Sequence, residues 1–131
     1  MTDRARTDWD PGTYARFRGH RLRPALDLLR ALPPLPDGPV VDLGCGDGAA
    51  GPMLAGLGRP VIGVDRSAAM LERARAAEGY DRIEAAEIAD WAPERPPALI
   101  FSNAALQWLD DHEGLLPRLV GFLAPGGTLA V

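Results

Sequence analysis

A glycine-rich stretch early in the chain has the composition of a ligand-binding loop. Gly44, Gly46 and Gly48 alternate with larger residues directly after the short apolar run 40–43. Glycines let a backbone turn tightly and let a ligand approach it closely, because no side chain occupies the space. A loop of this kind between a strand and a helix is where doubly wound sheets hold their ligands. A tight turn with nothing bound is the alternative.

Two cofactor classes fit this loop. Gly44, Gly46 and Ala49 satisfy the relaxed dinucleotide fingerprint Gly-x-Gly-x-x-Ala, so a nicotinamide cofactor is one candidate. Asp42 favours the other class, since a carboxylate just before the loop would repel a pyrophosphate. S-adenosylmethionine carries an ammonium and a sulfonium, and both cations complement an acidic residue. We therefore expect the methyl donor to be the cofactor.

A second acid, Asp65, ends the next apolar run, about twenty residues beyond the glycines. At this distance an acidic side chain meets the ribose hydroxyls of a cofactor, and one carboxylate can accept both protons. Both cofactor classes contain ribose, so Asp65 does not choose between them. An acid that merely leads into the following helix is the alternative.

The elements that must position these residues alternate between helix and strand. Apolar spacing over 14–32 predicts an amphipathic leading helix with a break at Pro24, and Ser67 is the expected N-cap of a helix over 68–78 that ends at Gly79 as C′ residue. The other expected elements are strands over 40–43, 60–65, 82–88, 98–102 and 128–131, and helices over 49–57 and 114–123. This alternation predicts an α/β fold with a Rossmann-like, doubly wound, mostly parallel sheet.

The composition indicates one domain with a small ligand. The chain has 131 residues, 47% of them hydrophobic, and we expect a helical lid segment over 1–36 and a Rossmann-like core over 37–131. A net charge of -4 argues against general attraction to nucleic acid or to an anionic membrane. Cys45 is the one cysteine, so neither an internal disulfide nor a metal site is expected. The charged start lacks a signal-peptide apolar region, which favours a cytoplasmic location.

The segment Ser102–Trp108 follows the fourth expected strand, at the edge where a transferred group should lie. It lacks the Asn-Pro-Pro-Tyr or Asp-Pro-Pro-Tyr arrangement of many amino-group methyltransferases. It also lacks the Pro-Cys pair of enzymes that methylate cytosine carbon. DNA bases are therefore poor candidates for the acceptor.

Three segments, Asp42–Gly48, Asp65–Leu71 and Ser102–Trp108, together resemble the class I methyltransferase family. The chain is also similar to the branch of that family that methylates trans-aconitate, in Tyr14, Phe17 and the segments 9–11, 21–29, 89–93 and 102–108. This resemblance covers nearly the whole chain from Trp9 onward. It implies in-line methyl transfer from S-adenosylmethionine to a carboxylate oxygen of a small acid. A different small acceptor, or a cofactor-binding module without turnover, are the alternatives.

The resemblance also implies where the cofactor is held. The glycine loop holds its methionyl end, Asp65 its ribose, and an acid after the third strand its adenine amino group. Glu87 stands at that last place, where the family more often has Asp; a solvated acid is the alternative, and Asp90-Trp91 could cover the adenine instead. The expected cofactor contacts are Asp42, Gly44, Cys45, Gly46, Asp65, Arg66, Met70, Glu87, Ile88, Ser102 and Asn103.

A carboxylate acceptor needs no general base, because an unperturbed carboxyl titrates near about 4, and no catalytic residue is assigned. Cationic partners for such an acceptor could come from the leading helix if it acts as a lid, with a solvated helix face as the alternative. The residues in question are Arg18, His20, Arg21 and Arg23. His112 is expected at the surface, and Trp108 could wall the acceptor pocket or belong to the core. The expected acceptor contacts are Tyr14, Arg21, Gln107 and Trp108.

The expected strand over 128–131 is the last segment of the sequence. The resembled family continues with two further strands, one of them antiparallel, and with segments that help to enclose the acceptor. We therefore expect a C-terminally truncated domain whose fifth strand is an open edge, with self-association through that edge. Cofactor binding is expected to survive in this form, and turnover to be poor or absent.

Overall fold

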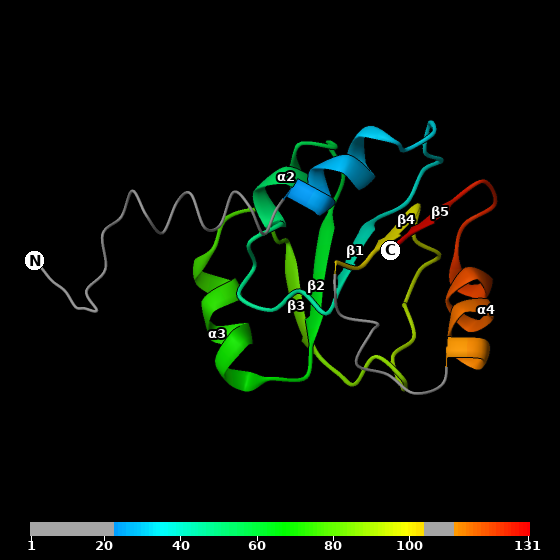
Figure 1. Cartoon of the computed structure of the whole chain (residues 1–131). Helices are drawn as coiled ribbons and strands as arrows, with labels where there is room; N and C mark the ends of the chain where they lie inside the picture. Colours follow the sequence, from blue (N-terminus) through cyan, green and yellow to red (C-terminus); the bar gives the residue numbers. More distant parts are fainter. Residues whose placement is uncertain (1–22, 104–111) are drawn as a thin grey trace, which may run out of the picture.

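A computed structural model describes residues 23–103 and 112–131, in which five strands form one sheet in the order β3-β2-β1-β4-β5 (Figure 1). The strands are β1 (Val40–Leu43), β2 (Val61–Asp65), β3 (Arg82–Ala85), β4 (Leu99–Phe101) and β5 (Thr128–Ala130). All neighbours pair in parallel. Because β1 pairs with both β2 and β4, its carboxyl end is the switch point of a doubly wound sheet. The predicted fold is confirmed.

Helices cover both faces of this sheet. A helix over 23–30, α2 (Gly51–Ala55) and α3 (Ala68–Ala76) lie on one face, and α4 (His112–Phe122) lies on the other. Successive strand residues point to opposite faces, so Val40 and Val41 belong to separate apolar clusters, the first shared with α2 and the second with α4. The two clusters hold the ends of β1, β2 and β4 in place.

Several elements are shorter than predicted. The strand expected over 82–88 ends at Ala85. The N–H of the next residue, Ala86, makes the last bond to β2 by donating to Asp65 O at 3.0 Å, and the chain then turns. The helix expected over 49–57 spans only Gly51–Ala55, and α4 occupies 112–122 instead of 114–123. Of the predicted leading helix, 23–30 is described, with Pro24 inside its first turn.

The predicted role of Gly79 as the C′ residue of α3 is wrong. The helix ends at Ala76, and Ala77 already has an extended backbone, with φ of -79° and ψ of 152°. Gly79 has a φ of 116° because it lies against α2, where a Cβ on it would be 2.3 Å from the carbonyl oxygen of Gly51. A glycine is needed there for the close approach of two backbones and not to end a helix.

We predict that Gly79→Ala lowers the free energy of unfolding far more than Gly58→Ala. Gly58 also has a positive φ, 74°, but no atom lies within 4 Å of a Cβ built on it. Backbone strain alone should cost about 1 kcal/mol at Gly58, and the added clash should at least double that loss at Gly79. Urea unfolding followed by circular dichroism measures both, and equal losses would contradict the packing described for Gly79.

Candidate functional site

The glycine loop lies at the carboxyl end of β1 and is built for close approach. The backbone N–H groups of Gly44 and Cys45 both donate to Val64 O, at 2.7 and 2.9 Å, which turns the chain sharply out of the sheet. Gly44, Gly46 and Gly48 have φ values of 76°, 57° and 88°. No atom lies within 4 Å of a Cβ built on Gly46, so its backbone is open on the side where a side chain would project. A ligand can reach the loop there.

Asp65, at the end of β2, holds this loop. Its Oδ2 accepts the N–H of Gly46 at 2.9 Å, and its Oδ1 accepts the N–H of Ser67 at 2.9 Å. A carboxylate has about four acceptor positions, so each oxygen keeps one for a ligand. The structure therefore brings Asp65 to the loop and gives it a role in anchoring the loop that sequence spacing does not show. Its contact with a ribose stays a prediction.

Asp42 is a buried acid below the loop, with 3% of its surface exposed. The hydroxyl of Tyr80 donates to its Oδ2 at 2.6 Å. The pKa of Asp42 is raised to about 6, mainly by burial. The negative charge of Asp65 contributes to this rise, and the Tyr80 hydrogen bond opposes it. Tyr80, whose own pKa is raised by burial and by Asp42, stays protonated as the donor. Sequence reasoning missed Tyr80 entirely.

Cys45 lies in the loop as a free, buried thiol. Burial raises its pKa to about 12, and the negative charges of Asp42 and Asp65 add to the effect. The thiolate is the nucleophilic form of cysteine, so this side chain is inert at neutral pH. Cys45 contributes backbone and volume to the loop and no covalent chemistry.

These residues surround a small hollow of about 120 Å³. Its lining residues are Asp42, Gly44, Cys45, Gly46, Asp47, Ala49, Ala50 and Asn103. Pockets for whole drug-sized ligands are larger, roughly 300–1,000 Å³, so this hollow suits one polar end of a cofactor. Two of its lining residues, Asp42 and Asp47, are acids, so this end of the site is acidic.

Ser102 ties the two central strands together beside the hollow. It is buried, with 2% of its surface exposed, and its hydroxyl donates to Leu43 O at 2.8 Å. The structure thus gives this hydroxyl a positioning role next to Gly44, and the cofactor contact of Ser102 stays a prediction. The next residue, Asn103, lines the hollow.

The predicted adenine end lies at the same edge of the sheet, on β2 and β3. Arg66 and Glu87 follow these strands and approach each other, with Nη1 and Oε2 3.9 Å apart and side chains 75% and 53% exposed. Met70, in the first turn of α3, is partly exposed, and Ile88 is half-buried. These four residues leave exposed polar and apolar surface beside Asp65.

The prediction that Trp91 could cover an adenine ring is wrong. Its indole is 4% exposed and packs edge-on against Phe122, with ring centroids 5.7 Å apart. Arg118 of α4 holds this segment, donating to Trp91 O at 2.5 Å and to Ile88 O at 3.4 Å. The indole thus belongs to the core of the second face, where α4 covers it.

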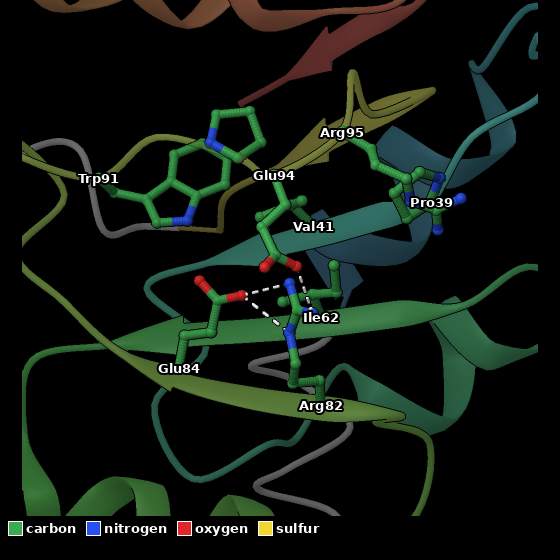
Figure 2. A pocket seen from close by; sticks show the side chains of 9 residues that line it. Pro39, Val41, Ile62, Arg82, Glu84, Trp91, Glu94 and Arg95 are labelled. Carbon is green, nitrogen blue, oxygen red and sulfur yellow. Dashed lines mark hydrogen bonds and ion pairs between the residues drawn. The ribbon is translucent and has the colours of Figure 1, made fainter.

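A second hollow, of about 40 Å³, lies on that face beside Trp91 (Figure 2). Arg82 lies at its mouth and pairs with Glu84 at 2.6 Å and with Glu94 at 2.7 Å. The raised pKa of Arg82 follows from its hydrogen bonds to these two carboxylates. The three side chains pair with one another in a surface ion network, and the hollow is small. The glycine loop is therefore the better candidate for a ligand site.

Several predicted residues lie outside the described residues, or their side chains do. They are Tyr14, Arg18, His20, Arg21, Gln107, Trp108 and the side chain of His112. Arg23 is exposed on the helix over 23–30. Within 23–103 and 112–131, no group of three or more His, Cys, Asp or Glu side chains could hold a metal ion. In the same ranges, no helix is long and apolar enough to cross a membrane.

Comparison with known families decides what kind of domain carries this loop. Residues 14–131 match the family described as methyltransferase domain. The chain belongs to this family. The predicted resemblance to methyltransferases is thereby confirmed, and the glycine loop lies inside the matched region.

Individual relatives of this methyltransferase domain agree. The chain is 50% identical over 126 residues to a trans-aconitate 2-methyltransferase of Methylobacterium radiotolerans, a match that covers 95% of this chain and 48% of that protein. It is also 50% identical over 128 residues to a trans-aconitate 2-methyltransferase of Variovorax paradoxus, covering 95% and 49%. The chain spans about half the length of these curated relatives.

Solved structures give the same fold. An S-adenosylmethionine-dependent methyltransferase from Mesorhizobium loti superposes with a TM-score of 0.69 at 32% identity, over 83% of this chain and 51% of that one. The DhpI-SAH complex superposes with a TM-score of 0.71 at 26% identity, over 90% and 58%. The five-stranded sheet is therefore the core of a Rossmann-like methyltransferase fold.

We predict that Asp42→Asn stabilises the fold at pH 8 and not at pH 4. Because the folded-state pKa of Asp42, about 6, lies above its ordinary value of 3.8, ionisation costs stability as the pH rises from about 4 through 6. The asparagine removes that cost and can still accept the Tyr80 hydroxyl. Unfolding free energy should rise by about 1–3 kcal/mol at pH 8. Equal effects at both pH values in urea titrations would contradict the burial of an ionisable Asp42.

Proposed function

We propose that this chain binds S-adenosylmethionine at the glycine loop and works in methyl transfer to a small carboxylic acid of the trans-aconitate kind. The observation that carries the cofactor assignment is that the buried acid Asp42 is among the residues that line the hollow. A buried anion favours a cationic partner, since pairing offsets the cost of desolvation. The α-ammonium of the methionyl end is such a partner and fits a hollow of this size.

The loop is poorly suited to the competing ligand, a dinucleotide pyrophosphate. A pyrophosphate is held by unpaired backbone N–H groups of the loop and of the helix that follows. Here five of the loop N–H groups already have acceptors within the protein. Gly44 and Cys45 donate to Val64 O, Gly46 to Asp65, Gly48 to Cys45 O, and Ala49 to Asp47. Together with the repulsion by Asp42, this favours the methyl donor over a nicotinamide cofactor.

The rest of the cofactor would extend along the edge of the sheet from β1 to β3. Asp65 keeps acceptor positions for two ribose hydroxyls beyond its bonds to Gly46 and Ser67. Glu87, more than half exposed, is the candidate partner of the adenine amino group. Its pairing with Arg66 across 3.9 Å is loose enough for a ligand to replace.

When bound, S-adenosylmethionine supplies an activated methyl group on a sulfonium. The residues of this chain then have to align the acceptor with it and exclude water, and no proton need be removed from a carboxylate acceptor. This agrees with the inert state of Cys45, whose pKa of about 12 leaves it uncharged.

The acceptor class rests on the relatives. Those at 50% identity are named trans-aconitate 2-methyltransferases, and the candidate acceptor residues Tyr14, Arg21, Gln107 and Trp108 lie outside the described residues. Another small acceptor remains the second candidate, because methyltransferase domains of this fold serve many chemistries.

We predict that the chain binds S-adenosylmethionine in preference to NAD, and that Asp65→Ala weakens this binding at least tenfold. The substitution removes two charge-assisted hydrogen bonds to the ligand, each worth roughly 1.5–3 kcal/mol, and also frees the loop. Isothermal titration calorimetry measures both affinities.

The matched control is Asp81→Ala, at the opposite edge of the sheet. Asp81 Oδ2 accepts the N–H of Val61 at 2.8 Å, a backbone-to-carboxylate bond like that of Asp65, but at the first residue of β2. This variant should lose stability and keep its affinity. Tighter binding of NAD, or equal losses of affinity in both variants, would sink the assignment.

Transfer is tested separately with donor carrying a labelled methyl group. Turnover is expected to be low, and any label that is transferred should enter trans-aconitate before neutral or cationic small molecules of the same size, because the proposed acceptor is an ionised acid. Donor binding without labelled product from any acid would favour the alternative of a cofactor-binding module without turnover.

A further inference from the structure

The ring of Tyr80 occupies a space that three glycines leave for it. A Cβ on Gly51 would lie 2.7 Å from Cε2 of the ring, one on Gly48 would lie 3.0 Å from the same atom, and one on Gly63 would lie 3.0 Å from Cδ1. These glycines belong to three separate elements: α2, the glycine loop and β2. The ring is thus held from three sides, just ahead of β3.

From this seat the Tyr80 hydroxyl reaches Asp42, across 38 positions of sequence, at 2.6 Å. In the described part of the chain, the titratable groups that act on Asp42 or on Tyr80 are Asp65 on β2 and Cys45 and Asp47 in the loop. These are acids and a thiol, and none of them is a cation. The Tyr80 hydrogen bond is therefore what favours the ionised carboxylate before a ligand arrives.

We infer that Tyr80 is a positioning residue for the cofactor: its hydroxyl keeps Asp42 ionised and oriented to receive the α-ammonium group at neutral pH. Tyr80 is not among the residues that line the hollow, so it acts through Asp42. This inference rests on the proposed function, because it requires a ligand with an ammonium group.

The consequence is a pH dependence of binding set by one hydroxyl. With Tyr80 in place, the pKa of Asp42 is about 6, so the free site is largely ionised at pH 7. Without the hydroxyl, the pKa rises, and the carboxyl stays protonated to higher pH. Loss of a hydrogen bond to a charged group corresponds to about one pH unit or more.

The experiment is a calorimetric titration with S-adenosylhomocysteine, whose single cation is the α-ammonium, between pH 5.5 and 7.5. Tyr80→Phe keeps the ring and removes the hydroxyl. Its affinity should be about fivefold below that of the unmodified chain at pH 6 and within about twofold at pH 7.5, as a one-unit shift requires. Tyr80→Leu also removes the ring, so the difference between Tyr80→Leu and Tyr80→Phe shows what loss of packing adds at each pH.

A second measurement tests the role of the Tyr80 hydroxyl if Tyr80→Phe does not fold. The chain contains two tyrosines, so in a Tyr14→Phe background 3-fluorotyrosine labels Tyr80 alone. Because Tyr14 is itself a candidate site residue, the reference is the same Tyr14→Phe variant with ordinary tyrosine. The fluorinated phenol is a stronger donor and should move the onset of binding to lower pH.

The outcomes are distinguishable. An unchanged pH profile in Tyr80→Phe, a loss of affinity by the same factor at every pH, or no movement with fluorotyrosine would each overturn the role of Tyr80 and leave the proposed function standing. Failure of the unmodified chain to bind S-adenosylhomocysteine at any pH would overturn the proposed function itself.

Discussion

The burial of the Asp42 carboxylate is the constraint on which the site depends. A charge so far from water is costly unless hydrogen bonds or an opposite charge offset the loss of hydration. The fold supplies the hydrogen bond through Tyr80, and three glycines on separate elements make room for its ring. In the proposed function the opposite charge comes from the ligand, which would account for an acid under the glycine loop. Ionised Asp42 would therefore favour a cationic ligand and at the same time lower the free energy of unfolding.

The loop itself is held before any ligand arrives. Asp65 fixes Gly46 from the end of β2, and Ser102 fixes Leu43 from the end of β4, so both neighbours of β1 determine where the loop begins. Because the N–H groups of Gly44 and Cys45 donate to Val64 O and that of Gly46 donates to Asp65, the loop offers a ligand few free donors. A cationic ligand gains from that arrangement and a pyrophosphate does not. The proposed selectivity for the methyl donor thus depends on how the loop is anchored as much as on its glycines.

Sequence patterns predict the sheet and the loop because these are local features. Apolar runs that end in Gly44 or Asp65, and Ser67 ahead of an Ala-rich stretch, each carry their meaning within a few residues. The Tyr80–Asp42 bond joins positions 38 apart, and the clasp of Arg118 on Trp91 joins positions 27 apart. Neither has a local signal. Gly79 misleads for the same reason, since it occupies the usual place of a helix end while its real constraint is the backbone of Gly51. The clearest hint of Tyr80 was the pair Gly51 and Gly63, glycines that no turn requires.

The most direct test of Asp42 as the counter-ion of the donor is the number of protons exchanged when S-adenosylmethionine binds. Titrations in buffers of different ionisation enthalpy measure it. A cation placed beside Asp42 lowers the pKa of that carboxyl from about 6, so binding at pH 6 should release protons. At pH 8 the sign should reverse, because a free α-amino group titrates near about 7.8 and must be charged in the complex. Release at pH 6 with uptake at pH 8 is the expected result, and binding with no proton exchange at pH 6 would contradict it.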